Sequence, residues 1–393
     1  MNKWIVLTAG IIIQTILGGI YAWSSFVPSL KYDYGLTNSE CGMIFGAMIA
    51  TFSIAMIPAG RLLKKFPPAF IAGTGAILFL SGYVLASFSQ GNFYLLLLSL
   101  SLICGTGIGF GYVVPLTVGM KWFPDHKGLI TGVSVAGFGL GALLLSFFVD
   151  YLLNTLHFNV LYIFRLTGLI FGSIAIISAL FMSEPEQDKN RIDDTGKIEL
   201  MPYLKSGLFW LICLGMFAGT FAGLITISKL KPLALSYGLS DNFAVWVISV
   251  FALGNATGRI LWGRIHDKFN SNKTIIMSLL FLGLSLIPLF FKLSAASSLI
   301  FTFISGIGFG SCFVVYASSI VQYYGIDCFP RLYPVCFLGY GLAGLTGPAV
   351  GGWIVDLSGF YGSAILLSIS IVLIALIIIA FGLNNIRLPS KGN

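Results

Sequence analysis

Charged side chains are scarce in this chain of 393 residues: Asp, Glu, Lys and Arg make up 9% of it, against about 25% in an average soluble domain. So few charges cannot cover a water-soluble globule, and the mean hydropathy of +0.95 agrees. The composition therefore excludes a soluble enzyme, a nucleic-acid-binding protein and a disordered protein. The six cysteines form no C-x-x-C pair and mostly lie in apolar runs, so we expect neither a disulfide framework nor a metal site.

Long apolar runs dominate the chain instead. A helix needs about 20 apolar residues to cross a bilayer, and continuous runs, unlike alternating ones, exclude a β-barrel. Twelve such runs lie at residues 4–27, 41–62, 68–88, 92–119, 128–150, 160–182, 207–230, 242–263, 274–291, 297–322, 332–355 and 361–384. The first run lacks a small-residue cleavage site, so we interpret it as a retained span and not a signal peptide. We expect an all-α membrane protein with twelve transmembrane helices.

Basic residues indicate the orientation of these helices. They gather in alternate connecting segments, including 61–65, 121–127, 189–205 and 264–273, and basic connections stay on the cytosolic side of a membrane. We therefore expect a multi-pass protein of the plasma membrane, in a prokaryote the cytoplasmic membrane, with both termini in the cytosol and a monomeric state.

An internal repeat divides the chain into two halves, residues 1–183 and 207–393, with the charged stretch at 184–206 interpreted as a solvated cytosolic linker. The matching segments are 34–38 with 237–241 and 60–66 with 263–269, each pair 203 residues apart, and 105–109 with 306–310, 201 residues apart. Two pseudo-symmetric six-helix halves are typical of carriers that work by alternating access. The repeat therefore favours a transporter over a channel.

Several motifs point to one family. They are Gly19-Ile20-Tyr21-Ala22-Trp23, the glycine-rich segment 105–112, Lys121-Trp122-Phe123-Pro124-Asp125-His126-Lys127-Gly128 and Gly258-Arg259-Ile260-x-Trp262-Gly263. With the loop segments 60–65 and 263–268, which are similar to a G-x-x-x-D-[RK] signature, they resemble the major facilitator superfamily. Within it, the chain resembles the oxalate/formate antiporter and monocarboxylate transporter group. The resemblance implies transport of small carboxylates, with Arg61, Lys64, Arg264 and Asp267 as gate-loop residues.

The chain departs from the group at several positions. The signature aspartate is Lys64 in the first half, whereas the second half keeps Asp267. Oxalate exchangers of this type are expected to carry a lysine where the chain has Tyr340. Animal monocarboxylate carriers are expected to have a lysine and an aspartate where the chain has Ser25 and Asn255. The missing lysine at position 340 counts against a dicarboxylate substrate.

Arg259 is the central candidate, because a charged residue inside the hydrocarbon is costly and functional by default. It lies five residues before Arg264, about 7.5 Å deeper along a helix, and its repeat position is Met56. One alternative is an arginine that extends to the headgroups. The other is a guanidinium that binds a substrate carboxylate through two hydrogen bonds. All 14 acidic residues lie in loops or at span ends, so the counter-charge would be a small monocarboxylate such as lactate, pyruvate or formate.

Other candidates surround this position. Asn255 lies four residues before Arg259 and hence on the same helix face, where it could hold the guanidinium or bind the substrate. Tyr21 continues a polar stripe on the first span. The remaining binding candidates are Tyr112, Tyr316, Phe337 and Tyr340, each of which could equally serve helix packing. Arg165 is expected to anchor at the membrane interface or pair with Asp150.

Several functions stay open. No nucleophile with a base and no phosphate-binding loop is present in the sequence, so we expect no enzyme, no cofactor and no ATP drive. The first hypothesis is a monocarboxylate carrier that works by anion exchange or proton symport, with a counter-anion or protons as further partners. The alternatives are oxalate-type dicarboxylate/formate exchange, a transport-like receptor, and multidrug export, which the lack of a buried acid in spans one to six disfavours.

Overall fold

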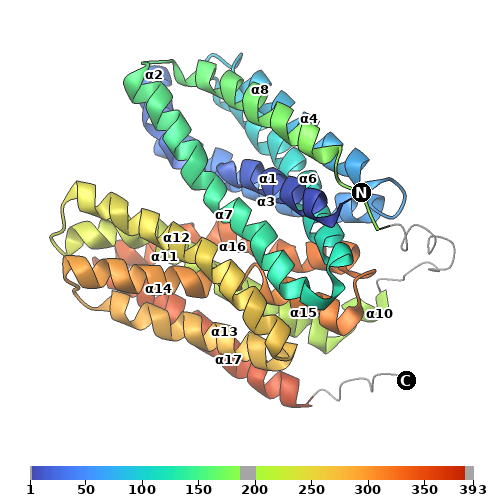
Figure 1. The fold of residues 1–393 in the computed structure, drawn as a ribbon. Coiled ribbons are helices and arrows are strands. Elements are labelled where there is room, and N and C mark those ends of the chain that lie inside the picture. The colour runs from blue at the N-terminus through green and yellow to red at the C-terminus, as the bar shows by residue number, and fades with distance from the viewer. Residues whose placement is uncertain (1, 186–200, 386–393) are drawn as a thin grey trace.

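The computed structural model describes residues 2–185 and 201–385, and within these ranges the regular elements are all helical. Figure 1 shows two groups of helices, the first half above and the second below. The long helices of the first half are α1 (Lys3–Gly18, continued by the 3₁₀ helix η1, Gly19–Ser25), α3 (Asn38–Leu62), α4 (Pro68–Ala86), α6 (Gly105–Trp122), α7 (Lys127–Asp150) and α8 (Val160–Ala179). Its short elements are α2 (Val27–Tyr34), α5 (Phe93–Leu96) with the π-helix η2 (Leu97–Cys104) that continues it, the 3₁₀ helix η3 (Pro124–His126) and the π-helix η4 (Tyr151–Thr155).

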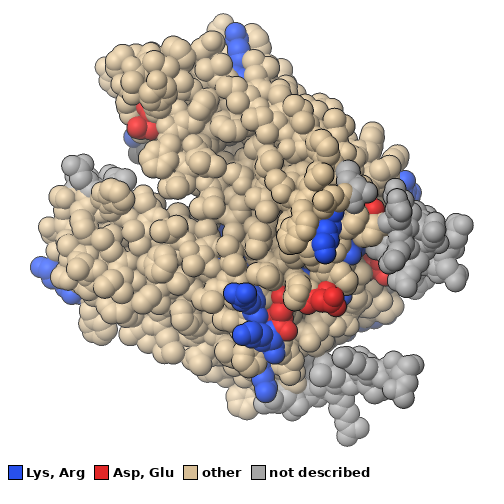
Figure 2. Space-filling model, viewed as in Figure 1, with Lys and Arg blue, Asp and Glu red and all other residues tan. Residues whose placement is uncertain are grey.

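The second half repeats this arrangement. Its long helices are α11 (Gly207–Ser236), α12 (Asp241–Lys268), α13 (Ser271–Leu286), the broken pair α14 (Ala295–Ser311) and α15 (Val315–Tyr324), α16 (Phe329–Ser358) and α17 (Gly362–Asn385). Among the described residues, eleven spans are long and apolar enough to cross a membrane. Helix α12 is counted as the twelfth transmembrane helix because of its length: its 28 residues extend about 42 Å. The prediction of an all-α membrane protein is confirmed, and Figure 2 shows a face on which most of the surface is uncharged.

The two halves meet closely at one end of the molecule, which we call the terminal end because α1 begins and α17 ends there (Figure 1). At one crossing, a methyl group on Gly263 of α12 would lie 2.3 Å from the carbonyl oxygen of Gly128 of α7. At the other, a methyl group on Gly60 of α3 would lie 1.5 Å from the carbonyl oxygen of Pro330 of α16. Only glycine permits such close backbone approach. At the opposite end the halves part and leave a notch (Figure 2).

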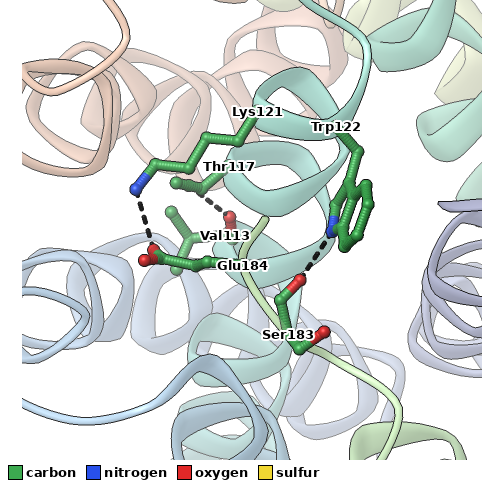
Figure 3. A network of polar contacts seen from close by, with 6 residues as sticks. All are labelled: Val113, Thr117, Lys121, Trp122, Ser183 and Glu184. Atoms are coloured by element: carbon green, nitrogen blue, oxygen red, sulfur yellow. Dashed lines mark hydrogen bonds and ion pairs between the residues drawn. The ribbon is translucent and has the colours of Figure 1, made fainter. Parts of the chain in front are cut away.

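The start of the segment between the halves is held by the end of α6. Lys121 Nζ forms an ion pair with Glu184 Oε1 at 2.8 Å, and Trp122 Nε1 donates a hydrogen bond to the carbonyl oxygen of Ser183 at 2.6 Å (Figure 3). The Lys-Trp pair of the 121–128 motif therefore fixes where the linker leaves the first half. The predicted linker at 184–206 includes residues 186–200, which lie outside the described residues, and it ends with the short helix α10 (Met201–Leu204).

A buried histidine makes the terminal end sensitive to acid. His266 lies past the predicted span 242–263, is 6% exposed, and its Nε2 lies 3.1 Å from Ser271 Oγ. That hydroxyl donates to Gln322 Oε1, and the Ser319 hydroxyl lies 3.3 Å from the same His266 nitrogen. Burial lowers the pKa of His266 to about 4.

Because the unfolded chain binds a proton to this histidine near pH 6.5 and the folded protein only near pH 4, the free energy of unfolding falls between these values as the pH drops. At pH 5 the expected loss is about 2 kcal/mol relative to neutral pH. Unfolding of purified wild type and His266→Gln across this range measures it: the wild type should lose more stability than the variant. Parallel curves would contradict a neutral buried His266.

Candidate functional site

Helix α12 is fixed on two sides by close backbone contacts. On one side, a methyl group on Gly132 of α7 would lie 2.4 Å from the carbonyl oxygen of Arg259. On the other side, a methyl group on Gly310 of α14 would lie 2.4 Å from the carbonyl oxygen of Asn255. Contacts this close leave little freedom to slide or rotate. The side chains of Arg259 and Asn255 therefore project from a rigid helix at the boundary between the two halves.

The Arg259 side chain is fully buried, with 0% of its surface exposed. Its Nε donates a hydrogen bond to Asn255 Oδ1 at 3.1 Å, and its Nη1 donates to the carbonyl oxygen of Val135 on α7. Its Nη2 has no hydrogen-bond partner. Of the two roles considered for Asn255, the structure thus shows the one that holds the guanidinium. Since the side chain is buried between halves, it does not extend to the headgroups.

No carboxylate balances this charge within the described residues, where the ion pair present is Lys121–Glu184. The guanidinium instead lies over aromatic rings: its Cζ is 4.2 Å from the ring centre of Phe313 and 6.0 Å from that of Phe138. Cation–π contacts of this kind stabilise a desolvated arginine by about 2 kcal/mol or more. They offset only part of the cost of burial, which leaves the free Nη2 as a strong site for an anion.

Aromatic side chains from both halves close the space around Arg259. Tyr21 of η1 packs edge-on against Phe138, with ring centres 5.6 Å apart, and its hydroxyl contacts the Tyr340 hydroxyl of α16. Tyr340 packs in turn on Phe313 at 5.4 Å. The Tyr21–Tyr340 contact is a polar bridge between the first and second halves beside the arginine.

Tyr112 and Phe337 lie in the same cluster, with ring centres 5.3 Å apart. The Tyr112 hydroxyl has no hydrogen-bond partner, and the charge of Arg259 acts on the hydroxyls of Tyr21, Tyr112 and Tyr340. The structure therefore brings together these three tyrosines with Phe337, Asn255 and Arg259. Their buried hydroxyls are potential hydrogen-bond donors for an anion.

Tyr316 lies apart from this cluster. Its ring packs against Gly215 of α11, where an added methyl group would lie 2.6 Å from Cε1, and Cys312 and Cys336 are its charged or titratable neighbours. The residue that occupies the expected place is Phe313, in the turn between α14 and α15. The repeat offered the signal, because the shift of 201 residues pairs Tyr112 with Phe313.

The gate-loop residues behave differently in the two halves. Asp267 accepts hydrogen bonds from the backbone N–H groups of Gly128 and Leu129, both at 2.8 Å. These amides begin α7, whose own N-cap His126 makes no side-chain hydrogen bond. A carboxylate from the second half thus caps a helix of the first half, which favours the closed terminal end.

Lys64 occupies the equivalent place beside the start of α16. Burial and the nearby Arg331 lower the pKa of the Lys64 ammonium. A cation at the positive end of a helix is unfavourable, and the neighbouring Asp327 offsets part of this effect. The second contact between halves therefore lacks the carboxylate cap on a helix start that Asp267 supplies to the first. The twin residues Arg61 and Arg264 are both exposed.

Arg165 takes a peripheral position. Its Nε donates to Ser87 Oγ at 3.4 Å and its Cζ lies 4.8 Å from the ring centre of Phe88. The expected pairing with Asp150 is absent from the described structure, where Asp150 accepts a hydrogen bond from Asn154 instead. Arg165 and Arg259 therefore differ in what surrounds them, although both lie in apolar runs.

Comparison with known proteins agrees with the fold. A sequence model of the Major Facilitator Superfamily matches residues 8–326 and 211–392. This match and the apolar helices define a multi-pass membrane transporter. The chain belongs to the Major Facilitator Superfamily.

Three relatives illustrate its place in the family. The chain is 26% identical to the uncharacterised transporter YhjX of Escherichia coli, over 88% of this chain and 86% of the relative. It is 24% identical to the oxalate:formate antiporter of Oxalobacter formigenes, over 100% and 93%. It is 26% identical to apicoplast pyruvate carrier 1 of Toxoplasma gondii, over 81% and 69%.

A solved structure shares the fold. The transporter FucP in its outward conformation superposes with a TM-score of 0.76, at 18% identity, over 97% of this chain and 99% of that chain. The relatives and the structural neighbour are transporters of this superfamily and not enzymes. The resemblance to the major facilitator superfamily that the sequence motifs indicate is confirmed.

Proposed function

We propose that the protein is a secondary active transporter of small monocarboxylates such as lactate, pyruvate or formate. The observation that carries the proposal is the buried Arg259 guanidinium, whose Nη2 lacks a partner. A substrate carboxylate would accept a charge-assisted hydrogen bond from Nη2 and supply the missing negative charge. Hydroxyls of the neighbouring tyrosines would donate hydrogen bonds to the remaining lone pairs of the carboxylate oxygens.

The charge of the site supports a monoanion. One cation balances one carboxylate, whereas a dianion such as oxalate would leave a second charge buried without a partner. Oxalate exchangers are expected to carry a second cation where this chain has Tyr340. Tyr340 is uncharged, and its hydroxyl contacts that of Tyr21. An oxalate-type exchanger remains the second candidate, since one relative is named an oxalate:formate antiporter. A relative named as a pyruvate carrier supports the first.

Alternating access would move residues 1–183 against 207–393. The glycine contacts at the terminal end and the notch at the opposite end fit a carrier open to the outside, with the basic terminal end and both chain termini in the cytosol. Exchange is favoured over net transport, because reorienting an unoccupied, unneutralised Arg259 would be costly. We propose a monomer of the plasma membrane.

Uptake of labelled lactate, formate and oxalate into proteoliposomes tests the function. We expect lactate or formate to enter faster than oxalate, and only when the vesicles hold an internal anion. If uptake into anion-free vesicles proceeds at the full rate when the outside is acidic, the mechanism is proton symport and not anion exchange. Faster uptake of oxalate than of either monoanion would favour the dicarboxylate exchanger.

A further inference from the structure

A groove between α7 and α12 is not used by the substrate site. It has a volume of about 360 Å³ and lies on the outer face of the molecule at the boundary between the halves. Its walls are apolar, and the large side chains Leu140, Leu253, Ile260 and Leu261 remain 39–52% exposed. A surface of this kind in a membrane protein faces lipid chains.

One charged residue lines the groove, and it lies at one end. Arg264 follows Ile260 by four residues, so both lie on the same face of α12, and the groove extends from Leu253 to Arg264, about 16 Å along the helix. The Arg264 side chain makes no hydrogen bond or ion pair to any described residue. The nearest acid along the helix, Asp267, has both oxygens bonded to the start of α7.

We propose that the groove binds an anionic phospholipid, with the phosphate at Arg264 and an acyl chain between α7 and α12. An apolar channel that ends in a guanidinium complements such a lipid, because arginine binds phosphate through two parallel hydrogen bonds and basic pockets between helices select anionic headgroups. Figure 2 shows basic side chains on this face over the end of α12 and the start of α13, with acidic side chains beside them.

The position of the groove gives the lipid a role. Its walls belong to both halves and adjoin the Gly128–Gly263 crossing, where Asp267 caps α7. A lipid in contact with both helices would stabilise the closed terminal end, in which they lie side by side (Figure 1). The lipid thus binds one conformation better than the other and shifts the population toward it.

The test uses the full chain in nanodiscs of phosphatidylcholine with or without phosphatidylglycerol. Native mass spectrometry should find phosphatidylglycerol retained by the wild type, and the lipid should raise the unfolding temperature. Arg264→Gln should reduce retention about tenfold. Thr257→Phe, which fills the groove at an exposed position, should reduce it as well.

Two matched controls make the test specific. Arg61→Gln removes the repeat twin of Arg264, and Thr8→Phe fills a separate groove between α1 and α8 whose lining lacks charge; both should retain phosphatidylglycerol as the wild type does. Equal retention by wild type and Arg264→Gln would overturn the proposal. So would an equal effect of phosphatidylcholine or phosphatidylethanolamine, or the same rise in unfolding temperature with inorganic phosphate alone.

Discussion

Replacing Arg259 by glutamine is expected to reduce carboxylate uptake by at least about 30-fold, because loss of one partner of a buried, hydrogen-bonded charge pair costs about 2–5 kcal/mol. Glutamine can still bond Asn255 or the Val135 carbonyl, so the helix contacts should survive. The measurement is initial uptake of labelled substrate into proteoliposomes with matched protein content. Unchanged monodispersity and unfolding temperature in detergent would show that the variant folds.

Arg165→Gln is the matched control for this prediction. It removes an arginine that also lies in an apolar run but contacts Ser87 and Phe88 at the periphery. Uptake by Arg165→Gln should stay within about twofold of wild type, since partly exposed polar contacts contribute less than about 1 kcal/mol. Normal uptake by Arg259→Gln would reassign Arg259 to a structural role.

Gly263→Ala is expected to disfavour closure of the terminal end. The new methyl group would lie 2.3 Å from the Gly128 carbonyl oxygen, and overpacking of this kind costs about 1–3 kcal/mol. The population of the closed state should therefore fall by about 5- to 150-fold, and the exchange rate should fall with it. Spin labels on the exposed Lys65 and Lys268, one in each half, would report a longer distance.

Gly73→Ala is the control for Gly263→Ala. It adds the same methyl group to α4, where nothing lies within 4 Å of the new atom. Both the label distance and the exchange rate should match those of the wild type. An unchanged distance in Gly263→Ala would mean that the α7–α12 crossing does not govern closure.

The spans and Arg259 could be predicted from the sequence because the bilayer imposes strong constraints. Backbone groups in hydrocarbon must bond within a helix, so continuous apolar runs have one solution. A charge inside such a run is costly, so the sequence alone marks Arg259 as a candidate functional residue. Asn255 followed from helix geometry, since four residues return to the same face.

The surroundings of Arg259 could not be predicted, because they depend on how helices from different halves cross. Neither the bond to the Val135 carbonyl nor the ring of Phe138 leaves a periodic signal in α7. Tyr112 and Tyr316 both follow glycine-rich segments, but the repeat shift of 201 residues pairs Tyr112 with Phe313. A ring without a hydroxyl contacts the guanidinium because cation–π attraction needs only the ring face.

The gate and the linker show the same limit. The signature implied a role for Asp267, but its partners are backbone amides of α7, which carry no side-chain signature. The charged stretch 184–206 predicts a solvated linker, yet Glu184 forms an ion pair with Lys121 of α6, and the preceding Ser183 accepts a hydrogen bond from Trp122. Both contacts join segments that are distant in sequence.

The central claim is that the partner of the Arg259 guanidinium is the transported carboxylate. Solid-state NMR of the wild type in lipid, with ¹⁵N in arginine and ¹³C in the carboxyl group of the best-transported substrate, measures the distance between them. A dipolar coupling that corresponds to about 4 Å, and that disappears in Arg259→Gln, is the predicted result. Saturably bound substrate without this coupling would contradict the account.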